Sequence, residues 1–203
     1  MSFDTSLLST TSELDAVNMM LQVVGESPID TLDENTLIES GMALRVLRSE
    51  SRALQLKGWH FNTDEHMTLL PHVTTGEIAL PPTTLSITFQ EADKDGALVY
   101  RAGKVYDRRA QTFAIGRKVY ADLVLLLPFE DMPEPARNFV SIRSCRRFQD
   151  SQLGDSSLHQ FGAQDELNAW SEFLSREAED SDYNINRDSP SVRIVTIRRG
   201  ARF

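Results

Sequence analysis

The sequence predicts an α+β protein in which a four-helix bundle is interrupted by a β-rich insertion lobe and followed by an extended C-terminal segment. Apolar residues recur at helical spacing in both end regions, whereas the middle third carries short alternating or β-branched runs bounded by Pro and Gly. Two helices on each side of the lobe bring its two ends together, which favours a bundle. The expected divisions are 1–58 and 131–186 for the two halves of the bundle, 59–130 for the lobe and 187–203 for a C-terminal arm.

Start and stop signals define the two helices of the first half. Ser12, followed three residues later by Asp15, resembles a capping box, and Gly25 is suited to end a helix over 13–24. A second start signal at 33–35 opens a longer helix that runs to Gly58. After Gly58 the helical period stops and an aromatic segment begins, so this position predicts a break from helix to strand.

The middle third is expected to hold short strands. The candidate segments are 59–62, 77–80, 85–90, 97–101, 104–108 and 121–127. Gly103, between two of them, indicates a tight hairpin turn, and the prolines of this region suit edges and connections because proline cannot donate to a strand ladder. The lobe is therefore predicted to be a small antiparallel structure.

Helical signals return at Asp131, which is expected to cap a third helix reaching about residue 152. Its predicted core positions are Ala136, Phe139, Val140 and Phe148. A fourth helix is expected from 157 or 162 to 179, with Leu167, Trp170, Phe173 and Leu174 as its core stripe. The polar run 180–182 is expected to end it.

Composition excludes several classes of protein. The formal charge of the 203 residues is −9, which argues against a nucleic-acid-binding module that neutralises phosphates. Subtracting the four arginines of the acid-free tail 191–203 leaves −13 for the remaining chain. The longest apolar run, 123–127, is far shorter than the roughly 20 residues of a membrane-spanning helix. The N-terminus shows no secretion signal, and the single Cys145 excludes an internal disulfide.

The sequence contains no complete catalytic or phosphate-binding motif. The segment 25–29 lacks the second glycine of a hydrolase elbow, and Leu98 occupies the first glycine position of a phosphate-binding loop. His60, His66 and His72 have no spacing typical of metal ligands, so they are interpreted as ordinary polar residues. No catalytic residue, metal or cofactor is therefore predicted, and the chain is not expected to be an enzyme.

Three groups of residues are candidates for structural contacts. Arg143, Arg146 and Arg147 share one helical face and suggest an ionic contact with a neighbouring subunit, with salt bridges inside the same chain as an equal alternative. Trp59 and Phe61 alternate with polar residues and are expected to anchor the junction core. The basic tail has strand character, against the alternative of a solvated terminus. Its candidate contact residues are Arg193, Ile194, Val195, Ile197, Arg198, Arg199 and Phe203.

The chain resembles the tail tubular protein A family of T7-like short-tailed bacteriophages. The resemblance covers about residues 13–186. Its blocks are ELDAVN at 13–18, GESP at 25–28, KGWHFN at 57–62, LLP at 69–71, RAGKVYDR at 101–108, DMPE at 131–134, RRF at 146–148 and DYN at 182–184. The tail 191–203 departs from the family pattern.

The resemblance implies a structural virion protein, synthesised in the host cytoplasm, that forms a twelve-subunit head-to-tail adaptor ring. Its expected partners are further copies of itself, the portal, the tail nozzle (tail tubular protein B), the tail fibre and double-stranded DNA passing through the lumen. An acidic body suits such a conduit because it repels phosphates, and the basic tail is the candidate portal contact. The alternatives are a tail-associated polysaccharide or cell-wall hydrolase and, against the charge balance, a small DNA-binding regulator.

Overall fold

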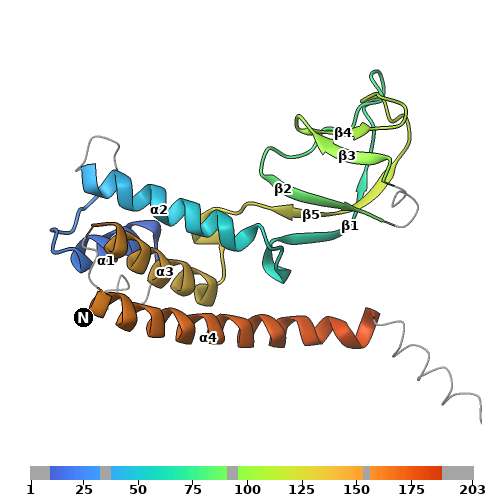
Figure 1. The fold of residues 1–203 in the computed structure, drawn as a ribbon. Coiled ribbons are helices and arrows are strands. Elements are labelled where there is room, and N and C mark those ends of the chain that lie inside the picture. The colour runs from blue at the N-terminus through green and yellow to red at the C-terminus, as the bar shows by residue number, and fades with distance from the viewer. Residues whose placement is uncertain (1–9, 33–37, 91–95, 153–155, 189–203) are drawn as a thin grey trace, which may run out of the picture.

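A computed structural model describes residues 10–32, 38–90, 96–152 and 156–188, and for 156–161 and 181–188 it describes the backbone alone. Over these residues the chain is a mixed α+β protein with two hydrophobic cores. One core lies among the helices, and the other lies within the β-lobe, which we define as residues 63–125 (Figure 1). Helices α1 and α2 precede the lobe, and α3 and α4 follow it, as the sequence predicts.

Helix α1 spans Glu13–Val23 and begins with the expected capping box between Ser12 and Asp15. Helix α2 spans Ile38–Gln55, whereas its predicted start at 33–35 lies outside the described residues. Helix α3 spans Glu134–Gln152, after a short 3-10 helix, η4, at Phe129–Asp131. Asp131 therefore belongs to the preceding turn instead of capping α3. The predicted core positions of α3 are all buried.

Helix α4 spans Ser156–Asp188 and corrects two predictions. It continues past Asp180, because a polar run does not by itself stop a helix, and the next proline in the sequence is Pro190. Phe173 is buried and Trp170 packs against the core, but Leu167 and Leu174 are 61% and 39% exposed. The predicted core stripe is therefore wrong at both leucines.

The predicted four-helix bundle is not confirmed. Helices α1, α2 and α3 pack against one another, whereas α4 packs chiefly along α3 (Figure 1). Helix α3 is consequently the central element, with α2 and α4 on opposite sides of it. The apolar face of α4 packs mainly against one helix, α3. It is therefore narrower than the apolar face of a helix that packs against two neighbours in a bundle.

The β-lobe contains an antiparallel sheet in the order β1-β5-β2 and a hairpin, β3-β4. Its strands are Thr63–Leu69, Thr84–Phe89, Leu98–Arg101, Lys104–Asp107 and Val119–Leu125 for β1 to β5. The hairpin turn places both Ala102 and Gly103 at positive φ, as a two-residue primed turn requires. The pairing of β1 with β5 is interrupted by a bulge between Asp64 and Met67.

Two strand predictions are wrong. Residues 77–80 make isolated bridges from Glu77 and Ala79 instead of a strand. The aromatic segment forms a 3-10 helix, η2, at His60–Asn62, and β1 begins only at Thr63. Hydrogen bonds from the backbone N–H of Asn62 to the carbonyl of Trp59, and from the N–H of Trp59 to the side chain of Asn62, close this turn. An alternating sequence pattern does not show that a hydrogen bond between a side chain and the nearby backbone will favour a turn over a strand.

Candidate functional site

The junction between the helices and the β-lobe is the first candidate functional site. The chain enters the lobe through β1 and leaves it through β5, and these two strands pair along their length (Figure 1). Gly58 makes the entry possible, because it has φ +73° and a Cβ there would lie 3.0 Å from a methyl group of Val124. The backbone conformation therefore favours glycine at this break, and the close approach of Val124 adds to that preference.

Two buried amide side chains fix the junction. The Gln55 side chain accepts a hydrogen bond from the N–H of Leu127 at 2.8 Å and donates to its carbonyl at 3.1 Å. The Asn62 side chain donates to the carbonyls of Gln55 and Leu125 at 2.9 and 2.8 Å. Gln55 and Asn62 are 0% and 3% exposed. Together they join the end of α2, the start of β1 and the end of β5.

An aromatic cluster covers the same junction on the side of α4. The ring of Phe173 lies edge-on to Trp59 at 4.7 Å between centroids and to Phe61 at 6.5 Å. Phe139 and Trp170 complete the cluster. The Trp59 indole N–H also donates to the carbonyl of Leu54 at 2.8 Å. Both predicted junction residues thus lie at the contact between η2, α3 and α4, partly buried against the helical core.

An arginine cluster on α3 links α2 to α4. Glu50 of α2 is 3% exposed and forms ion pairs with Arg143, at 2.8 Å, and with Arg147. Glu166 of α4 forms ion pairs with Arg146 at 2.6 Å and with Arg143 at 3.8 Å. The alternative of salt bridges within the chain is therefore present. Arg147 keeps 56% of its side chain exposed and remains the candidate of the three for an inter-subunit contact.

Replacing Glu50 with Gln is expected to lower the free energy of unfolding by about 1–3 kcal/mol. The change leaves two guanidinium groups without their buried carboxylate, but both arginines reach solvent, which limits the cost. Urea unfolding followed by circular dichroism measures the change. Glu172→Gln, on the exposed surface of α4, is the matched control and should shift the value by less than about 0.5 kcal/mol. An equal loss in both variants would contradict a role for the cluster in stability.

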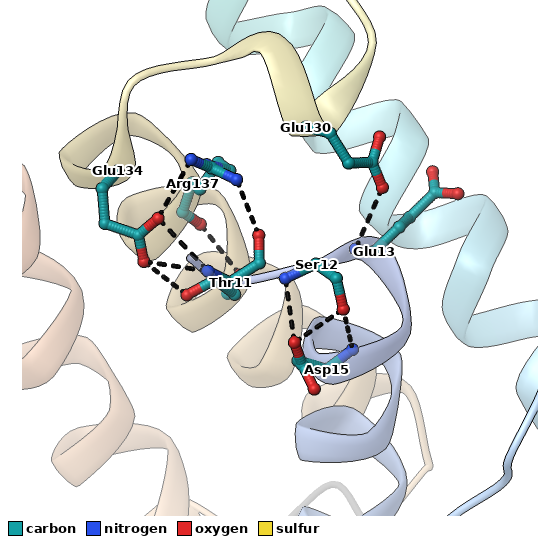
Figure 2. Close-up of polar contacts among 8 residues, drawn as sticks. Thr11, Ser12, Glu13, Asp15, Glu130, Glu134 and Arg137 are labelled. Carbon is teal, nitrogen blue, oxygen red and sulfur yellow. Dashed lines mark hydrogen bonds and ion pairs between the residues drawn. The ribbon is translucent and has the colours of Figure 1, made fainter. Parts of the chain in front are cut away.

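A polar clasp joins the start of α1 to the start of α3 (Figure 2). The N–H and hydroxyl groups of Thr11 donate to the carboxylate of Glu134, and Arg137 donates to the carbonyl of Thr11 at 3.0 Å. Arg137 is also paired with Glu134 at 3.2 Å. Beside the clasp, Arg48 of α2 binds both carboxylate oxygens of Glu13 at 2.9 and 3.0 Å. The first helix is thus held to both neighbours by its N-terminal turn.

The capping box of α1 predicts a pH dependence. The hydroxyl and then the backbone N–H of Ser12 donate to Asp15 and hold the pKa of its carboxyl below the ordinary value (Figure 2). A lowered folded-state pKa stabilises the fold above the unfolded-state pKa, and this contribution disappears as pH falls through the folded-state value. Asp15→Asn should therefore cost about 0.5–1 kcal/mol at pH 7 and almost nothing near pH 2. Thermal unfolding at both pH values checks this, and a loss that persists at low pH would contradict it.

A groove of about 680 Å³ lies between α1 and α4 and has α3 as its floor. Its walls include Met19 and Val23 on α1 and Glu172 on α4, and Cys145 lines its base. Burial raises the pKa of the Cys145 thiol to about 11, so the thiol is protonated at neutral pH. The groove offers apolar and amide surface, and no arrangement for nucleophilic chemistry is formed by the residues described in it.

Other predicted site residues are not brought together. The basic-tail candidates, from Arg193 to Phe203, lie outside the described residues. Within the described ranges, no group of three or more His, Cys, Asp or Glu side chains is placed to hold a metal ion. Nor does any helix of the described chain have the length and apolar character needed to cross a membrane.

Sequence reasoning missed Gln55, Asn62 and Glu50. Glu50 had a detectable signal, since a lone acid within the spacing of the buried α2 positions Leu47 and Leu54 predicts a buried partner for a cation. Gln55 and Asn62 had no such sequence signal, because their side-chain amides bond to backbone groups up to 72 residues away.

Comparison with known proteins identifies the class to which this fold and junction belong. Residues 14–183 match the model of the tail tubular protein family. The chain belongs to this family. It is 32% identical over 154 residues to tail tubular protein A of Klebsiella phage KP34, an alignment that covers 75% of this chain and 80% of that protein. The chain is therefore a structural protein of a bacteriophage tail that assembles with other tail proteins in the virion.

Proposed function

We propose that this protein is the head-to-tail adaptor, the subunit of a twelve-membered ring between the portal and the tail nozzle. The family membership supports the tail location, and one structural observation carries the finer assignment. A single chain holds two separate hydrophobic cores, joined by two paired strands and fixed by buried side chains. Such a subunit can contact ring neighbours with its helices while the β-lobe reaches a different partner.

The proposal extends to the other contacts of the subunit. The β-lobe projects away from the helices (Figure 1), which makes it the proposed surface for the tail fibre or the nozzle, tail tubular protein B. The basic tail, with Arg193, Arg198 and Arg199, is the proposed portal contact by strand addition. The chain outside that tail sums to −13, so a lumen lined by it would let double-stranded DNA pass without gripping its phosphates.

Electron microscopy of the chain co-expressed with its portal protein tests the proposal. We expect a ring seated on the base of the portal. Deletion of 191–203 should leave ring subunits intact but reduce their recovery with the portal. The hydrolase alternative predicts instead glycan turnover by the purified chain that a single carboxylate substitution abolishes. Turnover without any ring would overturn the adaptor assignment.

A further inference from the structure

A cavity of about 470 Å³ lies between the end of α2 and the side of α4, with α3 beneath it, and we call it the α2/α4 valley. Trp170 and Phe139 line its buried part, and Leu167, which is 61% exposed, lines its α4 side. The ammonium group of Lys57 lies 4.7 Å from the centre of the Trp170 ring. The guanidinium group of Arg143 lies 5.8 Å from the centre of the Phe139 ring. The valley is therefore aromatic and carries cations.

The valley has a surplus of positive charge. Three acids, Glu50, Asp150 and Glu166, pair with the three arginines of α3. The ion pairs found among the described residues do not include Lys57, so its charge is not balanced there. Arg147 keeps 56% of its side chain exposed beside it. The valley is therefore suited to a partner that offers apolar side chains and carboxylates.

The apolar surface continues from the valley along α4. Leu174 is 39% exposed and follows Leu167 by two turns on the same line of the helix. The spacing of α4 predicts that both leucines belong to a core, but the residues described in this chain do not cover them. Asp165 and Glu172 lie on the other side of α4, where they line the groove beside α1. The leucine side of α4 is therefore an apolar surface without acids, which is typical of a contact site.

The outer face of α1 is apolar and acidic. Residues 11–32 contain four acids and no Lys or Arg. On the helix itself Asp15 and Gln22 are exposed, and Met19 and Val23 are 40% and 39% exposed. At about 100° per residue, these four positions fall within about 100° around the helix axis. Helix α1 therefore presents one face that complements the valley in charge and in apolar character.

The valley and the outer face of α1 lie on opposite sides of α3. Arg143 lines the valley, whereas Cys145 lines the groove together with Met19 of α1. Arg143 and Cys145 are two residues apart, so their side chains point about 160° apart around the axis of α3. Helix α1 consequently cannot enter the valley of its own chain, and only another molecule can bring the two surfaces together.

The directions of the helices fit a contact between neighbouring copies. Helices α1 and α3 start at the same end, where the polar clasp joins them, and α2 and α4 run the opposite way (Figure 1). Neighbouring copies in a twelve-membered ring differ in orientation by only about 30°. Helix α1 of the next copy would therefore lie antiparallel to both α2 and α4, as neighbouring helices do in an up-and-down bundle.

We propose that α1 of one copy packs into the α2/α4 valley of the next copy. Met19 packs against Leu167 and Trp170, and the acidic side of α1 faces Lys57. The incoming helix completes a four-helix bundle with α2, α3 and α4 across the subunit boundary, and it covers the leucine side of α4. A contact between unlike faces is heterologous and generates a ring when the rotation between copies closes. The inference rests on the proposed adaptor ring and names its subunit interface.

Site-directed cross-linking tests this interface. Met19→Cys and Leu167→Cys are made separately in a Cys145→Ser background, mixed, assembled with portal protein and treated with a short bismaleimide. Both native side chains are exposed, so neither change opens a cavity in the core. We expect a covalent dimer only in the mixture of the two variants. Asp165→Cys, on the opposite side of α4, is the matched control, and its mixture with Met19→Cys should give no dimer.

The outcomes separate the interface from the adaptor assignment. Rings without a cross-link between Met19→Cys and Leu167→Cys would overturn the interface and leave the adaptor ring standing. A dimer in a single-cysteine sample, or a cross-link to the portal instead of a second copy, would also overturn it. A dimer in the mixture without a ring on the portal would support the contact and overturn the adaptor assignment. The absence of both dimer and ring would overturn both proposals.

A compensating pair of substitutions gives a second measurement. Leu167→Glu should reduce ring recovery at least about tenfold, because it places a carboxylate against the acidic face of α1. Adding Met19→Lys to the same chain should restore rings, since the new lysine meets the new glutamate of the neighbouring copy. Ser175→Glu, an exposed α4 position outside the valley, is the control and should change recovery less than about twofold. If the double variant folds, as circular dichroism can show, but forms no rings, the packing of Met19 on Leu167 is contradicted.

Discussion

Replacing Gln55 with Leu is expected to destabilise the protein by about 3–4 kcal/mol. The substitution keeps the size of the side chain but removes its hydrogen bonds to both backbone groups of Leu127 and to the hydroxyl of Ser51. Gln55 is fully buried, so no water replaces these bonds and the backbone groups lose their partner. Equilibrium unfolding in urea, followed by far-ultraviolet circular dichroism, measures the loss.

A matched substitution on the surface distinguishes this effect from a general cost of removing glutamine. Gln164 of α4 is exposed and bonds only to the neighbouring side chain of Asn168 at 3.2 Å among its described contacts. Gln164→Leu should change stability by less than about 0.5 kcal/mol. If Gln55→Leu costs as little as Gln164→Leu, the amide does not hold the junction.

Truncation of Phe173 to Ala is expected to cost about 3–5 kcal/mol. The ring is 2% exposed and contacts Trp59, Phe61, Phe139 and Trp170. Its removal opens a cavity at the point where α4 meets η2 and α3, and the paired rings lose their edge-on contacts. The unfolding midpoint should fall, and amide hydrogen exchange in α4 should accelerate more than in the β-lobe, because the lobe has its own core.

The neighbouring residue supplies the control for this experiment. Leu174→Ala removes an exposed apolar side chain from the same turn of α4 and should cost less than about 1 kcal/mol. Equal losses at the two positions would mean that the aromatic cluster contributes no more than ordinary surface contacts. Equal acceleration of exchange in α4 and the lobe would contradict the separation of the two cores.

Local signals predicted the four helices and the β3-β4 hairpin. The capping box at Ser12 and the glycine turn of the β3-β4 hairpin are interactions between residues close in sequence, and both are present in the structure. The packing arrangement was harder to predict. Apolar spacing shows that α4 has a buried side, but it does not show how many helices that side covers. For this reason the predicted bundle was not confirmed, and the burial expected for Leu167 and Leu174 was wrong.

Some residues of the candidate site could be predicted from the sequence, and others could not. The aromatic residues Trp59 and Phe61 are conspicuous in sequence because large rings require burial. Gln55 and Asn62 look like ordinary polar residues, since their role depends on meeting the ends of β5 across a long sequence separation. The arginine cluster on α3 was predictable only in part; its members are Arg143, Arg146 and Arg147. Their common face could be read from spacing, but their acidic partners on α2 and α4 could not.

The bulge between β1 and β5 has a consequence for how the β-lobe can move relative to the helices. The two strands lead from the helices into the lobe, and backbone pairing holds them together on both sides of the bulge. At the bulge the pairing is interrupted, His66 adopts φ +57°, and its N–H bonds to the side chain of Asp122 at 2.8 Å instead of to the backbone of β5. If a tail component pulls on the lobe, we therefore expect the lobe to bend first at His66, where the backbone pairing that joins it to the helices is interrupted.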